Sequence, residues 1–355
     1  MARIDELLSK LKDCGGSDLH LTAGMEPRIR IHGELESVEG WSVLDDGGLR
    51  ELIRPLASPA QWARFESCSD LDFAYGLEGV ARFRANYFVQ ERGAGAVFRM
   101  IPERIIPLED LLLPKAIERF VHLEHGLVLV TGPTGSGKST TLAAIIDKIN
   151  RTYRRHIVTL EDPVEFVHAN KESVFSHREI GTHTGGFAEG LRAAIRQDAD
   201  VILVGEMRDY ETISLAITAA EMGLLVFGTL HTNNAPKTVD RIIDSFPSEE
   251  QDQARLSLSD SIAGIVSQLL LPTADGKGRR AVVEILLHSQ ALPNVIREGN
   301  TPMIHSLIQS GRSEGMQSMD DALFELVEAG EIRPHDAYMK ATEKARFEPF
   351  LPQES

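Results

Sequence analysis

The stretch GLVLVTGPTGSGKST, residues 126–140, decides the fold of the larger part of this chain. It begins with an apolar run at 127–130, which is typical of a strand buried inside a parallel sheet. The pattern G-x-x-x-x-G-K-S follows directly, and a helix-like segment comes after it. A strand, this pattern and a helix in that order predict a phosphate-binding loop.

Each residue type in this loop has a chemical reason. Glycines let backbone N–H groups turn inward around phosphate oxygens, and the helix N-terminus adds partial positive charge. We expect the ammonium of Lys138 to reach the β/γ oxygens and the hydroxyl of Ser139 to bind Mg²⁺. The alternative is a glycine-rich turn that matches the motif by chance. The strand before the motif and the helix after it argue against that alternative. The predicted phosphate-binding residues are Gly132, Pro133, Thr134, Gly135, Ser136, Gly137, Lys138, Ser139 and Thr140.

Further apolar runs recur downstream, with helix-like segments between them. They lie at 156–160, 201–204, 224–230 and 281–287. This alternation predicts a wound parallel sheet, and the chain after about residue 288 is predicted to be mostly helical.

Two carboxylates stand at the ends of these runs, where α/β sheets present their ligands. Glu161 ends the run 156–160, and Glu206 follows the run 201–204 as a variant Walker B residue. Hydrolysis needs a group that orients water and a carboxylate on the metal side. The spacing alone leaves open which of the two does which, and a surface carboxylate at a strand end remains the alternative for each.

A histidine follows the run 224–230. His231 is either a sensor of the terminal phosphate or an ordinary strand-end histidine with local hydrogen bonds, and the spacing leaves both open.

Length and charge narrow the class of protein. A chain of 355 residues is too long for one typical core, so two domains are expected. The net charge of −16 disfavours binding to nucleic acid without regard to sequence. Two cysteines provide neither a disulfide framework nor a CxxC zinc site. The acidic start and the lack of any run near 18 apolar residues predict a soluble, cytoplasmic protein.

The first third of the chain has shorter elements. Helices are predicted at 4–12, 46–57 and 60–65, and strands at 18–22, 28–32, 70–75, 81–89 and 96–101. The last two strands are joined by a turn at 91–95. We therefore predict an α+β domain over 1–105, a proline-rich linker over 106–118 and an α/β domain over 119–355.

Four blocks of this sequence closely resemble the PilT-type motor ATPases of type IV pili, within the secretion-ATPase superfamily. They are GPTGSGKSTT, TLEDPVEFVH, VILVGEMRD and GTLHTNNAPKTVDRIIDSFP, which look like its Walker A, Asp box, Walker B and His box. The similarity extends to GGSDLHLTAG, FRANYFVQERGAGAVFRMIP and GMQSMDDAL, and so covers nearly the whole chain.

The resemblance implies a PAS-like N-terminal domain, a RecA-like ATPase domain and a homohexameric ring, with ATP and Mg²⁺ as the ligands. It implies that Glu161 activates water and that Glu206 holds Mg²⁺ through water. Arg84 and Arg99 look like the family's N-domain arginines that reach the γ-phosphate. From the residues alone, both arginines would be interpreted as solvated strand edges.

Two positions depart from the family pattern. Leu224 stands where the family usually has an earlier histidine, which bears on one polar contact near the nucleotide or the subunit interface. Pro293 replaces the arginine of the family's AIRNLIRE motif, which is linked to retraction.

The leading hypothesis is a hexameric motor that hydrolyses Mg·ATP to retract type IV pilus fibres for twitching motility. Its implied place is the cytoplasmic side of the inner membrane, with the pilus platform protein and a PilU-like paralogue as partners. The alternatives are an accessory PilU-like ATPase, suggested by residues 275–280, and a scaffold subunit of low turnover, disfavoured by Glu161 and Glu206. A pilus-assembly ATPase would usually carry a tetracysteine zinc site, and a nucleic-acid translocase is disfavoured by the net charge.

Overall fold

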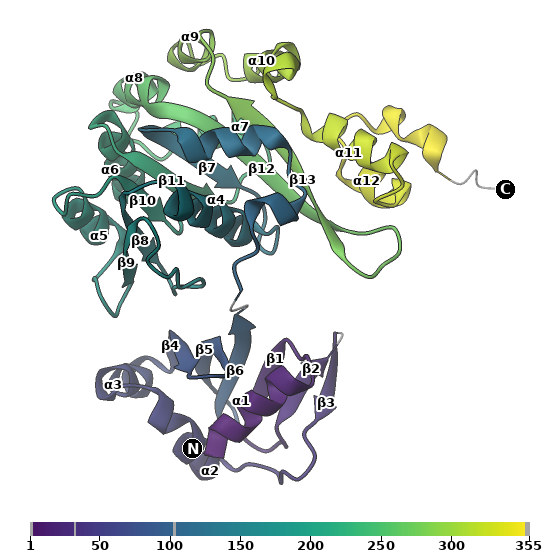
Figure 1. Cartoon of the computed structure of the whole chain (residues 1–355). Coiled ribbons are helices and arrows are strands. Elements are labelled where there is room, and N and C mark those ends of the chain that lie inside the picture. The colour runs from purple at the N-terminus through teal and green to yellow at the C-terminus, as the bar shows by residue number, and fades with distance from the viewer. Residues whose placement is uncertain (1–2, 32, 102–103, 352–355) are drawn as a thin grey trace. The chain divides into compact units, whose positions relative to one another are not determined.

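The computed structural model describes residues 3–31, 33–101 and 104–351 (Figure 1). His32, at the end of one predicted strand, and Pro102, in the proline-rich stretch, lie outside the described residues. The chain divides into two compact units. The first comprises Met1–Arg104 with Asp162–Val167, and the second Ile105–Glu161 with His168–Ser355.

The first unit is an antiparallel sheet with helices. The strand order is β3-β2-β1-β6-β5-β4. The strands are β1 (Asp18–Thr22), β2 (Arg28–Ile31), β3 (Glu34–Ser37), β4 (Asp70–Leu77), β5 (Ala81–Gln90) and β6 (Gly93–Ile101). The helices are α1 (Arg3–Asp13), α2 (Asp46–Ile53) and α3 (Pro59–Cys68), with a 3₁₀ turn at Arg54–Leu56.

Sequence signals explain where the helices of this unit begin. Asp45 accepts a hydrogen bond from the backbone N–H of Gly48 (2.7 Å) at the start of α2. Ser58 and Gln61 form a capping box at the start of α3, with Pro59 in its first turn. Alternate residues of β5 are buried, and the hydroxyl of Tyr87 donates to the carbonyl of Ile53 (2.9 Å) inside the core.

The second unit contains a seven-stranded sheet in the order β13-β12-β7-β11-β10-β8-β9, in which only β13 is antiparallel to its neighbour. The strands are β7 (Gly126–Thr131), β8 (His156–Glu161), β9 (Val174–Glu179), β10 (Val201–Val204), β11 (Leu225–Leu230), β12 (Ile262–Pro272) and β13 (Arg279–Leu287). The helices are α4 (Lys138–Thr152), α5 (Phe187–Ala194), α6 (Tyr210–Glu221), α7 (Ala235–Ile243), α8 (Gln251–Ser261), α9 (Leu292–Arg297), α10 (Met303–Ser310), α11 (Met319–Glu328) and α12 (Pro334–Lys340).

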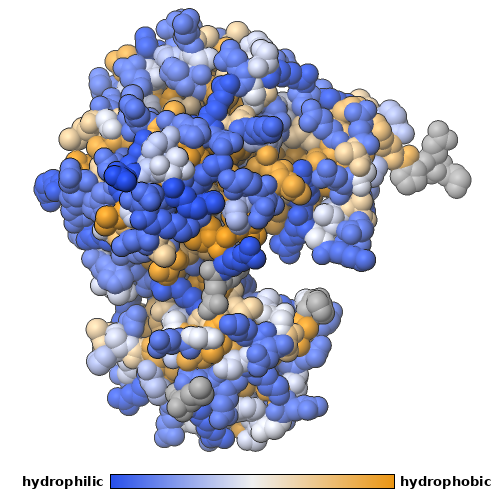
Figure 2. All heavy atoms as spheres, in the orientation of Figure 1, coloured by the Kyte–Doolittle hydropathy of each residue, from blue (hydrophilic) through white to orange (hydrophobic). Residues whose placement is uncertain are grey.

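The predicted fold class is confirmed: an α+β unit is followed by an α/β unit with a parallel central sheet and a helical C-terminal region. Strands β3, β9 and β12 were not predicted. All four residues of β3 are exposed, and β9 is a partly exposed edge strand, so neither carries the apolar run of a buried strand. On the visible face of the larger unit, hydrophilic residues surround smaller hydrophobic areas (Figure 2).

The segment 106–118, predicted to be a linker, is grouped with the second unit. It carries the 3₁₀ turn Leu108–Leu111 and the start of another, Lys115–His122. Ile117 is buried in the core of this unit, and Lys148 of α4 forms ion pairs with Glu109 (2.9 Å) and Glu118 (2.5 Å). Conversely, Asp162–Val167 is grouped with the first unit, where the carbonyl of Val164 accepts from Arg82 Nε (3.0 Å).

Within the described residues, no helix combines the length and the apolar character that crossing a membrane would need.

Helices α11 and α12 and the chain after them form a small separate core with β12 and β13, around Leu323, Ala337 and Phe347. Next to it, the carboxylate of Asp321 accepts from Ser318 Oγ (2.7 Å) and pairs with Arg346 (2.6 Å) and with Arg312. Burial opposes the charge of Asp321, but these three partners outweigh it and lower its pKa to about 2.

We expect Asp321→Asn to destabilise the protein by about 2 kcal/mol at pH 7, since a pKa lowered in the folded state stabilises it above the unfolded value. This contribution is lost as pH falls from about 4 through about 2, so the difference from the native protein should shrink at pH 3. Urea unfolding at pH 7 and pH 3 measures it. Asp336→Asn, which breaks the exposed Arg333–Asp336 pair, is the matched control and should change little. An equal effect of both variants at pH 7 would contradict the assignment.

Candidate functional site

Four neighbouring strands bring the predicted site residues to one edge of the second unit's sheet. β7, β11, β10 and β8 are adjacent and parallel, so their carboxyl ends lie together (Figure 1). The phosphate-binding loop follows β7, His231 follows β11, Glu206 lies two residues after β10, and Glu161 ends β8. This edge is where a parallel sheet presents a ligand.

The loop after β7 has the backbone that its glycines predict. Gly132, Gly135 and Gly137 have φ values of +143°, +79° and +86°, which favour glycine. A Cβ on Gly132 would lie 2.2 Å from the carbonyl oxygen of Gln268, so this position also has no room for a side chain. Pro133, Thr134, Gly135 and Ser139 are exposed, and the loop is therefore open to solvent on one side.

The loop contains two groups that fit a bound phosphate. Lys138 Nζ donates to the carbonyl oxygens of Gly132 (2.8 Å) and Pro133 (3.0 Å), which places its ammonium over the start of the loop. Ser136 Oγ is buried, and none of the described residues forms a hydrogen bond with it. A cation and an unsatisfied hydroxyl in a glycine-lined turn at the start of α4 suit the oxygens of a nucleotide phosphate.

Glu206 is part of a charged cluster. Its Oε1 lies 2.6 Å from Arg208 Nε and 3.0 Å from His231 Nε2, and its Oε2 accepts from Arg208 Nη2 (2.6 Å). Burial opposes the charge of Glu206, but Arg208 and His231 outweigh it and hold its pKa below the ordinary value. Glu206 is therefore ionised at neutral pH, as a carboxylate on the metal side must be.

Glu161 is held beside the strand that leads to Glu206. Leu160 is paired with Val204, and the backbone N–H of Gly205 donates to the carbonyl of Leu160 (2.8 Å). A Cβ on Gly205 would lie 3.3 Å from Cα of Glu161, so glycine allows the two strand ends to approach closely. One carboxylate thus ends β8 and the other follows β10, on the same edge of the sheet.

The donor set fits Mg²⁺ rather than a metal held entirely by protein. Among residues 3–31, 33–101 and 104–351, no group of three or more His, Cys, Asp or Glu side chains is placed to hold a metal. Mg²⁺ usually keeps several waters and binds through one or two carboxylates together with substrate phosphates. Glu206 is one such carboxylate on this edge, and the exposed hydroxyl of Ser139 in the loop is a further oxygen ligand for Mg²⁺.

Arg84 and Arg99 lie in the first unit, directly opposite each other on β5 and β6. Arg84 Nε is 3.7 Å from Asp72 Oδ1, and Arg99 Nε donates to Asp18 Oδ1 (2.7 Å). Their side chains are 46% and 70% exposed, so both guanidinium groups remain accessible. This geometry is compatible both with solvated strand residues and with a pair that meets an anion.

The two departures from the family pattern have clear structural positions. Leu224 immediately precedes β11, about 20 Å of strand away from His231 at the other end, so it does not line the phosphate edge of its own sheet. Pro293 lies in the first turn of α9, where proline is tolerated, and Arg297 of the same helix donates to Ser259 Oγ (3.0 Å). The helix therefore forms without the family's arginine.

Two residues at the site were not predicted from the sequence. Arg208 is two positions after Glu206, and an arginine that close to a candidate carboxylate is a signal that could have been used. Gln268 of β12 is buried and bonds to the phosphate-binding loop, although it lies 130 positions after Lys138. Nothing in its local sequence marks it.

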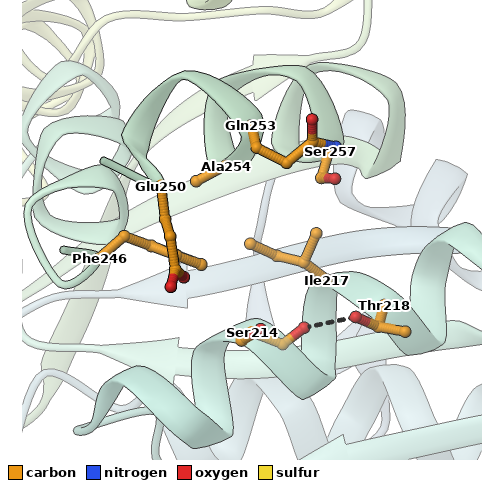
Figure 3. A pocket seen from close by; sticks show the side chains of 8 residues that line it. All are labelled: Ser214, Ile217, Thr218, Phe246, Glu250, Gln253, Ala254 and Ser257. Atoms are coloured by element: carbon orange, nitrogen blue, oxygen red, sulfur yellow. Dashed lines mark hydrogen bonds between the residues drawn. The ribbon is translucent and has the colours of Figure 1, made fainter. Parts of the chain in front are cut away.

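A separate cavity of about 310 Å³ lies between α6 and α8. Figure 3 shows its lining, which mixes the hydroxyls of Ser214 and Thr218 with the side chains of Ile217, Phe246 and Glu250. None of the predicted site residues lines it.

Comparison with known proteins supplies the family. Residues 81–338 match the family model described as type II/IV secretion system protein. The type IV pilus retraction ATPase PilT of Pseudomonas aeruginosa is 48% identical, over 95% of this chain and 98% of its own length. The type IV pilus ATPase PilU of the same organism is 38% identical, over 95% of this chain and 88% of its own length. A crystal structure of the pilus retraction motor PilT with bound ADP superimposes with a TM-score of 0.91 at 42% identity, covering 98% of this chain and all of that one.

Proposed function

We propose that this chain, which belongs to the type II/IV secretion system protein family, is an ATPase that powers the retraction of type IV pilus fibres. The observation that carries the proposal is that the loop of Lys138, Glu161 and Glu206 lie on one edge of the same sheet, in a chain similar to PilT over nearly all of its length. An intact pair of carboxylates speaks against a scaffold subunit of low turnover. The greater identity to PilT than to PilU, over the same share of the chain, favours a retraction motor over an accessory one.

Each residue at this edge has its own proposed role in ATP hydrolysis. The loop from Gly132 to Thr140 binds the phosphates, with Lys138 as the cation at the β/γ oxygens. Glu161 orients and deprotonates the attacking water. Ser139 and Glu206 are the residues that would hold Mg²⁺, and the bound ion would supply positive charge beside the phosphate oxygens. His231, hydrogen-bonded to Glu206, is the proposed sensor of the terminal phosphate.

A motor does mechanical work only if ATP hydrolysis changes the position of one part of the protein relative to another. We propose a homohexamer in which the first unit of one subunit closes over an ATPase unit and brings Arg84 and Arg99 to the γ-phosphate. Arginine forks match phosphate oxygens, and the attraction depends on whether the γ-phosphate is present. The ring would act on the integral-membrane platform protein of the pilus at the inner membrane, and a PilU-like paralogue is a further expected partner.

We expect Arg84→Ala and Arg99→Ala to lose most ATPase activity while keeping ADP binding and the hexamer, because neither arginine contributes to the loop that binds ADP. Phosphate release, ADP titration and light scattering measure the three properties. Arg92→Ala is the control, since Arg92 is exposed in the turn of the same hairpin and the charge change is the same. Full activity of the double arginine variant would leave both residues as solvated strand positions.

Mixed rings test whether the arginines act between subunits. Neither an Arg99→Ala ring nor a Glu161→Gln ring should turn over by itself. Recovered hydrolysis after mixing indicates that an arginine of one subunit serves the site of another, whereas no recovery indicates action within one subunit.

Deletion of the gene tests the direction of work. If the protein is a retraction motor, the deletion cells should carry more surface pili than wild-type cells and should not twitch. If it is a pilus-assembly ATPase, they should lose their pili. An accessory PilU-like ATPase predicts that twitching persists, at least in part, when the gene is deleted.

A further inference from the structure

Gln268 lies beneath the phosphate-binding loop. It belongs to β12, which pairs with β7 so that Ser267 stands opposite Thr131, the last residue before the loop. The residue is 2% exposed. Both ends of its amide are used: Oε1 accepts from Thr141 Oγ1 (2.8 Å) and Nε2 donates to the carbonyl of Ser136 (2.6 Å).

These contacts reach the loop at two places and the helix that follows it at a third. Besides Ser136 in its middle and Thr141 in the first turn of α4, the Gln268 backbone touches the loop's beginning, where a Cβ on Gly132 would lie 2.2 Å from the Gln268 carbonyl oxygen. A Cβ on Gly137 would lie 2.8 Å from Gln268 Nε2. The Gln268 backbone thus leaves no room for a side chain at Gly132, and the Gln268 amide packs closely against Gly137.

The chemistry of the amide fits this place. The carbonyl of Ser136 can only accept a hydrogen bond, so the amide nitrogen must face it and the amide oxygen is left for the hydroxyl of Thr141. In a trans peptide, C=O and the following N–H point in opposite directions. Because Gln268 holds the Ser136 carbonyl toward β12, the N–H of Gly137 is turned away from β12.

We propose that Gln268 is a positioning residue, which holds the phosphate-binding loop in the shape that binds nucleotide phosphates. The inference rests on the proposed function only in that the loop binds ATP and ADP. Without the amide, the Ser136–Gly137 peptide is free to rotate, and a loop N–H no longer points to a fixed place. The loop then loses conformational entropy each time a nucleotide binds, and this loss weakens the affinity.

The test is ADP binding to the full-length protein, measured by titration calorimetry. Gln268→Met keeps the length of the side chain and removes both hydrogen bonds, and we expect it to weaken ADP binding by about 10- to 100-fold. The KM for ATP should rise by a similar factor, with kcat at saturating ATP changed by less than about 3-fold, as loss of uniform binding predicts. A general loss of folding would not produce this split.

Ser267→Ala is the matched control. It removes the buried hydrogen bond that Ser267 Oγ accepts from Thr131 Oγ1 (3.0 Å), without touching residues 132–141. We expect it to lower the melting temperature but to leave ADP affinity within about 2-fold. An equal loss of affinity in Ser267→Ala and Gln268→Met would overturn the proposal.

Thr141 provides a second route if Gln268→Met does not fold. Thr141→Val removes the partner that fixes the Gln268 amide and should weaken ADP binding by roughly 5-fold, whereas Thr141→Ser keeps the hydroxyl and should restore it. Equal affinity of the two Thr141 variants would contradict the proposal. Native protein that fails to bind ADP would instead refute the proposed function, so the two failures are distinguishable.

Discussion

Lys138→Ala should abolish ATP hydrolysis and weaken ATP binding by at least about 100-fold, because charge-assisted hydrogen bonds to phosphate contribute roughly 1.5–3 kcal/mol each. The ammonium already lies over the start of the loop, on the carbonyl oxygens of Gly132 and Pro133. Phosphate release measures turnover, and equilibrium titration with ATP measures binding.

Lys148→Ala is the matched control for Lys138. Lys148 is on the same helix and has the same charge, but it pairs with Glu109 and Glu118 on the segment before β7. We expect the Lys148→Ala protein to be somewhat less stable and to hydrolyse ATP at a native rate. Near-native hydrolysis by purified Lys138→Ala protein would show that the nucleotide site has been placed wrongly.

Glu161→Gln should bind Mg·ATP with nearly native affinity and hydrolyse it about 10²- to 10⁴-fold more slowly. The amide has the shape of the carboxylate, but it cannot take the proton of the attacking water, and removal of a general base costs rates of this order. Single-turnover kinetics with preformed complex separate binding from chemistry.

Two further variants sharpen the assignment of Glu161. Glu206→Ala should instead damage turnover in a way that depends on the Mg²⁺ concentration, since its proposed role is on the metal side. Glu172→Gln, which only breaks the exposed pair with Arg154, should leave turnover unchanged. If Glu161→Gln kept full kcat and lost only nucleotide affinity, Glu161 would not be the residue that activates water.

The turn between β5 and β6 shows what a sequence pattern predicts correctly and what it does not. The pattern places a turn at 91–95, and a five-residue turn there would set Arg84 opposite residue 102. In the structure only Glu91 and Arg92 form the turn, and Gly93 already pairs with Gln90. This register places Arg84 opposite Arg99, because every pair in a hairpin follows from the length of its turn.

The sequence by itself determined the phosphate-binding loop, the buried strands β7, β8, β10 and β11, and the polar residues that stand at their ends, but not the buried strand β12. These features depend on neighbours within a few residues: apolar runs, glycines and a lysine at fixed spacing. The tertiary structure alone decided the contacts that join distant parts of the chain. Gln268 supports a loop 130 positions earlier, and His231 meets Glu206 from the next strand, because the order of strands in the sheet brings them together. No local pattern encodes that order.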